Sequence, residues 1–265
     1  MKKNTIFKTI LLAIFMASAM SLFAAKEFTK EINKNFNISD GGKVEIINKY
    51  GNVDVRPVDG NEVTFKVEIL VEAKNEERAN EIFDAIDIDF YDTRDYVKAE
   101  TSLAGMNKFW KKVKNWGKNN SYEINYYVNA PRHLYLVLNN KYGHIHTEDM
   151  DNKMGIELKY GNFTIGSVHD LDVELGYGNG EAAHIQNANI TVKYGKISIE
   201  KAQNIEVESK YSTIEVGEAR EIRSTSKYNT FRLGDLRVFR NEGKYDKFRI
   251  ENVNDIRGHT KYTVM

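Results

Sequence analysis

A tyrosine that recurs about every 17 residues is the feature that most restricts how this chain can fold. One spacing is 18 residues and the next six are 17, and lysine precedes the tyrosine in seven of the eight copies. A repeat of this length is too short to bury an apolar face alone, so its copies must stack on one another. The copies begin at Tyr142, Tyr160, Tyr177, Tyr194, Tyr211, Tyr228, Tyr245 and Tyr262.

The pattern inside each copy predicts strands. With the tyrosine as position 1, positions 4 and 6 are apolar in most copies, and position 12 is apolar too, as in Ile197, Ile199 and Ile205. Alternation with a period of two residues is typical of β-strands, and the step from position 9 to position 12 requires a turn. We therefore expect two short strands per copy, joined by bends. Stacked at about 4.8 Å, they form a parallel β-solenoid with 17-residue rungs, so the fold class is mainly all-β.

The preceding part of the chain is less regular. Residues 44–50 match the end of a rung and residues 53–55 its start, because Tyr50 carries the same Lys-Tyr-Gly signature. A helix is predicted over 75–86, with Asn75 as its N-cap. We expect further strands at 63–71, 86–90, 96–101 and 122–128. The predicted organisation is a β-rich section over 26–131, continuous with the solenoid or capping it, followed by regular repeats over 132–265.

The first 25 residues have the order of a secretory signal peptide. Lys2, Lys3 and Lys8 precede an apolar run over 10–23, and Ala24 and Ala25 offer small residues for cleavage. The apolar run is too short for a membrane span, and no later stretch is long enough. We therefore expect an exported protein without a transmembrane span, located in the periplasm or at the cell surface.

Composition excludes several functions. The chain has no cysteine, so disulfides, thiolate catalysis and cysteine-bound zinc are excluded. Without the leader, 35 basic residues stand against 38 acidic ones, which argues against a nucleic-acid binder. His144 and His146 share one strand face without an evident third ligand, and the acidic stretch 148–152 lacks the glycine and closing glutamate of a calcium loop. We expect no metal and no cofactor.

The recurring Asn-x-Tyr-Gly-x-Val/Ile element, found at 48–55, at 140–146 and in the later copies, resembles that of the putative adhesin family. This family comprises bacterial exported domain-of-unknown-function proteins that are also described as adhesin-like or autotransporter-head-like. The strand, acidic-capped helix and proline-preceded strand between 63 and 131 are similar as well. The resemblance implies a β-solenoid at the cell envelope and supplies no catalytic residues.

The tyrosine column has two interpretations. A stack of rings is a structural ladder, and an exposed strip of rings is a surface on which sugars stack. The neighbouring lysines place like charges side by side, and the glutamates at position 15 (Glu157, Glu174, Glu208 and Glu242) offer a way to relieve that repulsion.

Arg223, Arg240 and Arg257 share position 13 and form a basic stripe. One interpretation is protection of the last rungs against strand addition, with Glu206, Glu221 and Glu242 as partners. The other is binding of an anionic partner. No accompanying column of carboxylates indicates acid–base catalysis.

Both tryptophans of the chain, Trp110 and Trp116, lie in a basic segment, 107–120, together with Lys111 and Lys112. This segment is predicted to cover the open end of the solenoid core or to dock a partner or a membrane surface.

These patterns together predict a non-enzymatic, exported, adhesin-like envelope protein that presents a repetitive surface to a protein or glycan, with weak end-to-end self-association as a further possibility. The alternatives are a structural or envelope-stress scaffold without its own ligand, and a glycan-active β-helix enzyme.

Overall fold

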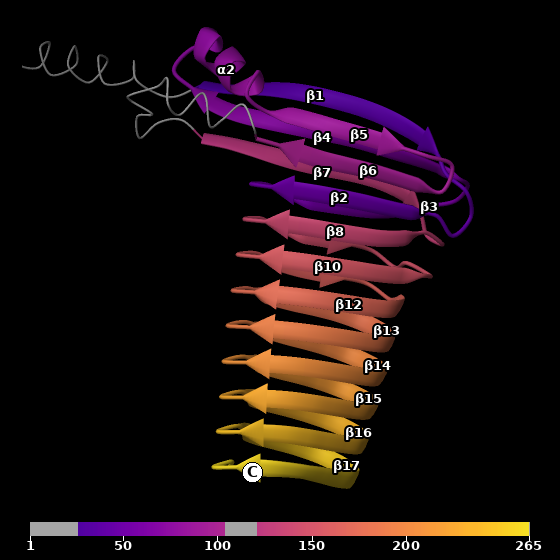
Figure 1. The fold of residues 1–265 in the computed structure, drawn as a ribbon, viewed down its shortest axis with the longest axis vertical. Helices are drawn as coiled ribbons and strands as arrows, with labels where there is room; N and C mark the ends of the chain where they lie inside the picture. Colours follow the sequence, from indigo (N-terminus) through magenta and orange to yellow (C-terminus); the bar gives the residue numbers. More distant parts are fainter. Residues whose placement is uncertain (1–25, 104–120, 265) are drawn as a thin grey trace, which may run out of the picture. The chain divides into compact units, whose positions relative to one another are not determined.

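The computed structural model describes residues 26–103 and 121–264, and these residues form a parallel β-solenoid with a β-rich N-terminal section and one short helix. Successive strands of the solenoid lie one below the next in Figure 1. The rungs consist of β8 (Tyr135–Lys141), β9 (Ile145–Thr147), β10 (Lys153–Lys159), β11 (Asn162–Ile165), β12 (Val168–Gly176), β13 (Asn179–Lys193), β14 (Lys196–Lys210), β15 (Thr213–Lys227), β16 (Thr230–Lys244) and β17 (Lys247–Lys261).

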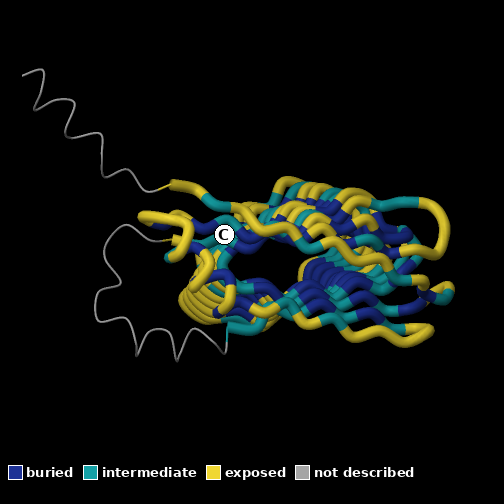
Figure 2. The backbone as a smooth tube through the Cα atoms, turned by 90° about the horizontal axis from the view of Figure 1, so that it is seen from above, coloured by how far each residue is buried: buried dark blue, intermediate teal, exposed yellow. Residues whose placement is uncertain are grey.

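The register explains the 17-residue period. From β12 to β17, paired residues are always 17 positions apart; Ile205, for example, lies between Ala188 and Ile222. All these pairings are parallel. The apolar positions of the rungs before β17 therefore meet in buried columns, which Figure 2 shows as dark blue on the inner side of the backbone layers.

The later rungs differ from the expectation of two separate short strands. Strands β13 to β17 are each continuous over 15 residues, and the predicted bends lie inside them. The ladder skips single residues at the bends: Glu200 between the pairings of Ile199 and Lys201, and Gln203 between those of Ala202 and Asn204. The corner bends the backbone without ending the hydrogen-bonded strand.

The first rung is formed by residues well before the regular repeats, as the sequence predicts. Strand β2 (Lys43–Lys49) pairs with β8, and β3 (Val53–Val58) pairs with β9, both in parallel. On their other edges, β2 pairs with β6 (Tyr96–Ser102) and β3 with β7 (Ser121–Pro131). Tyr50 thus lies in the same column as Tyr142.

The tyrosine turn explains the Asn-x-Tyr-Gly motif. Each tyrosine, from Tyr50 to Tyr262, has a positive φ of 52–64°. The Asn140 side chain donates to the Gly51 carbonyl at 2.8 Å and accepts from the Lys141 backbone N–H. A Cβ on Gly178 would come within 1.8 Å of the Gly161 carbonyl oxygen, so the residue after the tyrosine must be glycine in these rungs.

The chain divides into two compact units, and helix α2 (Glu76–Phe83) belongs to the unit that contains residues 69–87. Asn75 caps this helix as predicted, accepting from the Arg78 backbone N–H at 3.0 Å. The helix ends at Phe83, three residues before the predicted end, with Asp84 as its C-cap, and β5 (Asp87–Asp92) follows. Strands β1 (Lys26–Asn37) and β4 (Glu62–Ala73) complete the N-terminal section.

Candidate functional site

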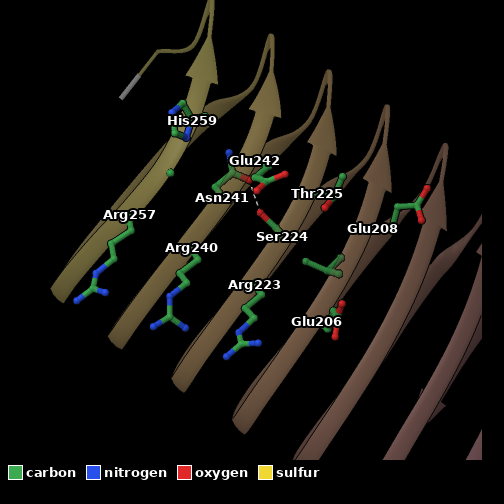
Figure 3. Close-up of a pocket in the computed structure, with 12 residues that line it drawn as sticks. Glu206, Glu208, Arg223, Ser224, Thr225, Arg240, Asn241, Glu242, Arg257 and His259 are labelled. Atoms are coloured by element: carbon green, nitrogen blue, oxygen red, sulfur yellow. Dashed lines mark hydrogen bonds between the residues drawn. The ribbon is translucent and has the colours of Figure 1, made fainter.

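A hollow that is lined mainly by charged and polar side chains lies on the outer face of strands β14 to β17. It has a volume of about 840 Å³ and is open to solvent. Figure 3 shows that Arg223, Arg240 and Arg257 extend side by side from successive strands. The outward side chains that line it are Glu206, Glu208, Arg223, Thr225, Arg240, Glu242, Arg257 and His259.

The strand period brings these residues together. Positions 13 and 15 of each rung face outward, whereas position 14 faces the core. In the ladder, Arg223 pairs with Arg240, and Arg240 pairs with Arg257. Three guanidinium groups therefore recur at the strand spacing of about 4.8 Å.

Carboxylates on neighbouring positions balance part of this charge. Glu221 accepts from Arg223 Nε at 2.7 Å and also pairs with Arg240, while Arg257 pairs with Asp255 at 2.7 Å. The hydrogen bond from Arg223 holds the pKa of Glu221 below its ordinary value. Of the partners predicted for the stripe, Glu221 is engaged, whereas Glu206 and Glu242 form no ion pair within the described residues.

The arginines are nevertheless accessible. The side chains of Arg223 and Arg257 are 63% and 66% exposed, and that of Arg240 is 39% exposed. A guanidinium presents five N–H donors, so one carboxylate partner leaves donors for a ligand. The hollow can therefore hold a carboxylate, sulfate or phosphate group.

Beneath the hollow, the core of the last rungs turns polar. The Ser224 hydroxyl donates to Asn241 Oδ1, and Ser226 lies 2.9 Å from both Asn241 Oδ1 and Asp246 Oδ2. Asp246 is buried and also accepts from the Asn229 backbone N–H at 2.8 Å. Asn241 Nδ2 is buried without a partner. The polar residues at positions 14 and 16 are visible in the sequence, but the bonds among them are not.

The nine tyrosines form one continuous stack. Neighbouring ring centroids are 4.8–5.2 Å apart, and the ring planes differ by at most 16°. Each ring from Tyr142 to Tyr245 is covered on both faces by its neighbours, and only its edge and hydroxyl reach solvent. A sugar ring needs an open aromatic face, so stacked sugars have no access to these rings.

Lysines line this tyrosine stack. Lys141 Nζ lies 5.1 Å from the centroid of the Tyr142 ring, and Lys227 Nζ lies 5.1 Å from that of Tyr228. Within the described residues, none of the lysines before a stacked tyrosine forms an ion pair, and Glu157, Glu174, Glu208 and Glu242 relieve none of their charge by such contacts. We name this surface the lysine–tyrosine edge; it comprises Lys49, Lys141, Lys159, Lys193, Lys210, Lys227, Lys244 and Lys261 with the tyrosines that follow them.

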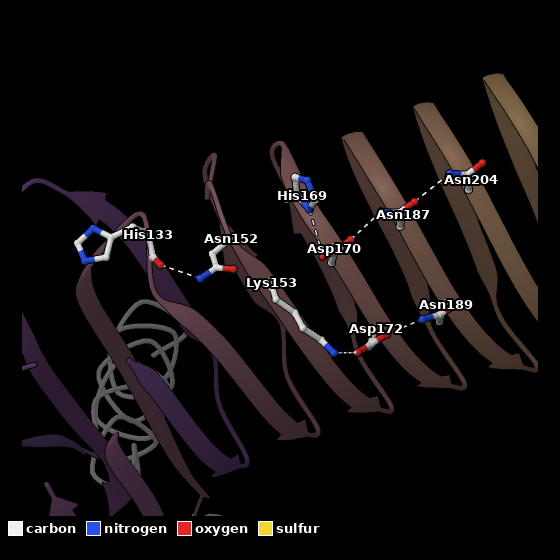
Figure 4. Close-up of polar contacts among 9 residues, drawn as sticks. All are labelled: His133, Asn152, Lys153, His169, Asp170, Asp172, Asn187, Asn189 and Asn204. Carbon is white, nitrogen blue, oxygen red and sulfur yellow. Dashed lines mark hydrogen bonds and ion pairs between the residues drawn. The ribbon is translucent and has the colours of Figure 1, made fainter. Parts of the chain in front are cut away.

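Polar ladders run across other outer positions of the rungs. Figure 4 shows Asp170, Asn187 and Asn204 in one ladder, with amide donors 2.8 and 2.9 Å from the acceptors. In a second ladder, Asp172 accepts from Asn189 and pairs with Lys153 at 2.6 Å. Burial disfavours ionisation of Asp172, but these two contacts outweigh it and hold its pKa below the ordinary value. These ladders join neighbouring rungs.

The other predicted site residues are placed as follows. His144 and His146 are exposed in the β8–β9 region, and no group of three potential metal-binding side chains occurs in residues 26–103 and 121–264. Trp110, Trp116, Lys111 and Lys112 lie outside the described residues, as does the predicted leader. In the same described ranges, no helix has the length and hydrophobicity to cross a membrane.

The stacked rungs define the class of this protein as a parallel β-solenoid, and a solved structure shares this fold. A protein from Parabacteroides distasonis named a "putative adhesin" matches with a TM-score of 0.55 at 11% identity, over 89% of this chain and 97% of that one. A "putative adhesin" from Bacteroides fragilis matches with a TM-score of 0.48 at 17% identity, over 89% of this chain and 97% of its own. At 11% identity, the likeness to the Parabacteroides distasonis structure establishes the fold and not the function. No protein-family model matches the chain, and no curated protein does either.

Proposed function

We propose that this chain is a non-enzymatic, exported, adhesin-like protein of the cell envelope, which presents the outer face of its solenoid to a protein or glycan. The observation that carries this proposal is the open hollow lined by Arg223, Arg240 and Arg257. Its fold is similar to that of a protein named a "putative adhesin", which supports the same function. The signal-peptide pattern of residues 1–25 supports export to the periplasm or the cell surface.

The chemistry of the hollow favours an anionic group on the partner. Guanidinium groups bind carboxylates and phosphates through paired N–H donors, and such charge-assisted hydrogen bonds are stronger than neutral ones. The repeated arginines offer this contact on three successive rungs. A partner that carries several acidic groups would therefore bind more tightly than one with a single group.

A scaffold without its own ligand is the second candidate. It is favoured by the ion pairs that Arg223 and Arg240 form with Glu221 and that Arg257 forms with Asp255. In that case the stripe protects the outer face of the last rungs and contributes to stability alone.

Binding to a panel of immobilised neutral and acidic glycans and glycoproteins separates the two candidates. The triple variant Arg223→Gln, Arg240→Gln, Arg257→Gln should lose at least about tenfold in affinity for the acidic members, because three charged donors are removed. The matched control Arg56→Gln, Arg232→Gln, Arg249→Gln removes the same charge elsewhere and should bind normally. If the unmodified protein binds no member of the panel, the scaffold is favoured and the proposal is wrong.

A further inference from the structure

Three properties of the lysine–tyrosine edge favour binding of an anionic partner. Its lysines repeat at the strand spacing of about 4.8 Å. The five lysines from Lys193 to Lys261 are exposed on consecutive rungs, and the rung before them has Gly176 in place of a lysine. Within the described chain none of them is neutralised by an ion pair. Like charges so close together repel one another, because their spacing is shorter than the screening length of about 8 Å at physiological salt.

The neighbouring tyrosines add hydrogen-bonding groups but no free aromatic faces. Tyr194, Tyr211 and Tyr228 are 39–49% exposed, while their ring faces are covered by the stack. The edge therefore offers an ammonium group on nearly every rung and a phenol ring edge beside it. Neutral sugars gain little from this arrangement, whereas acidic groups gain a charged donor at each step.

We propose that the lysine–tyrosine edge binds a linear acidic polysaccharide that runs along the solenoid axis. A sugar residue in an extended chain advances by a distance close to one rung, so the carboxylates that face the edge recur at whole multiples of the rung spacing, within reach of the flexible lysine side chains. Hydroxyl groups of the sugars exchange hydrogen bonds with the tyrosine hydroxyls. Binding of a polyanion also removes the repulsion between neighbouring lysines, which gives this edge an affinity that separate lysines would lack.

Nucleic acid fits the same edge less well. Proteins that bind single strands stack bases on exposed aromatic rings, and the covered tyrosine faces exclude this contact. Along duplex DNA, the phosphates of one strand recur every ~3.4 Å, which does not match the rung spacing. Acidic sugar chains satisfy both the charge and the spacing.

The site is separate from the arginine hollow, so its test also distinguishes the two. Polygalacturonate serves as the probe, a linear neutral glucan as the negative control, and an oligothymidylate as the competing polyanion. The test variant carries Lys193→Gln, Lys210→Gln, Lys227→Gln and Lys244→Gln. The matched control carries Lys66→Gln, Lys153→Gln, Lys196→Gln and Lys201→Gln, four lysines that are ion-paired elsewhere.

The unmodified protein should bind polygalacturonate with an affinity that falls as salt rises. The edge variant should lose at least about tenfold in affinity. Its affinity should also depend less on salt, because fewer lysine–carboxylate contacts release fewer counterions on binding. The matched control should retain its affinity. Circular dichroism and thermal unfolding of both variants check that they fold.

Three results would overturn the proposal. The proposal is wrong if the edge variant binds polygalacturonate as the unmodified protein does, if the neutral glucan binds as well as polygalacturonate, or if the oligothymidylate binds more tightly than polygalacturonate. The triple arginine variant belongs in the same assay. Loss of polygalacturonate binding in that variant alone would place the glycan in the hollow, which would support the proposed function while refuting the site at the edge.

Discussion

At the scale of single residues, the tyrosine column balances backbone strain against ring stacking. A bulky residue with positive φ is unfavourable, because its Cβ comes close to the neighbouring carbonyl oxygen. Every tyrosine of the column nevertheless adopts this conformation. Stacked aromatic pairs contribute about 0.5–1.5 kcal/mol each beyond burial, so an internal ring with two neighbours recovers at least part of the strain.

Replacing Tyr211 with alanine should destabilise the protein by about 1–3 kcal/mol, because two ring pairs are lost while the positive φ is retained. Chemical denaturation measures the change. Tyr211→Phe is the matched control, since it keeps the ring and removes the exposed hydroxyl, and it should cost little. Equal losses in the two variants would mean that stacking does not stabilise the column.

The same residues show how far sequence reasoning reaches. The 17-residue spacing of the tyrosines is enough to predict that they align, because residues one rung apart must be neighbours in a parallel solenoid. Spacing alone does not reveal the positive φ or the nearly parallel rings that cover each other's faces. Those features depend on the turn geometry, and they decide between the ladder and the sugar-stacking strip.

At the scale of the rung, the turn after the tyrosine depends on close approach of two backbones. Gly143, Gly161 and Gly178 each lie where a Cβ would meet a carbonyl oxygen of the previous rung within 1.9 Å. In later rungs, Asn229 and Asp246 occupy this position, and their side chains accept from backbone N–H groups one rung earlier, at Ser212 and Asn229. Backbone contact thus closes the turn in the earlier rungs, and side-chain hydrogen bonds close it in the later rungs.

Gly178→Ala should lower stability by at least about 1–3 kcal/mol, because the added methyl group forces the two rungs apart. Gly155→Ala is the matched control, since its Cβ would meet its nearest neighbour at 3.6 Å, an ordinary contact distance. Thermal unfolding of the two variants makes the comparison. Equal melting temperatures would contradict the close-packed turn.

The sequence predicts the strands of the rungs more accurately than the end of the helix. Alternating apolar residues identified the strands well, since a buried face requires that pattern. The bends inside β13 to β17 were expected to interrupt the strands, yet backbone hydrogen bonds continue around the corner because the rungs on both sides bend in the same way. The apolar spacing predicts that the helix extends to Ile86, which is too far. Ala85 and Ile86 are apolar, but they form the turn into β5. The sequence predicts Glu221 as a partner of the arginine stripe but not Asp255, which pairs with Arg257 from two residues earlier on the same strand.

At the scale of the whole molecule, stability should depend on acidic side chains that link neighbouring rungs. A hydrogen bond from Lys196 lowers the pKa of Glu215, and one from Asn187 lowers that of Asp170. The pKa of Glu221 is lowered as well, by Arg223. A carboxyl group with a lowered folded-state pKa stabilises the fold above its unfolded pKa, and this contribution is lost as the pH falls through the folded value.

The free energy of unfolding should therefore decrease as the pH is lowered from about 5, because carboxyl groups of the unfolded chain take up protons near pH 4. The double variant Glu215→Gln, Glu221→Gln should show a smaller decrease, since two of the linked groups no longer titrate. Urea denaturation at a series of pH values measures both curves. Parallel curves for the variant and the unmodified protein would show that these two groups do not contribute.

The identical register of successive rungs also has a consequence for how the gene can evolve. From β12 onward, partner residues are always 17 positions apart, so duplicating or deleting one such segment of the gene leaves every column aligned. Recombination between such similar segments can therefore lengthen or shorten the solenoid without a new fold having to arise. Length is then the property of this protein that selection can alter most easily, and each added segment extends the same surface by one step.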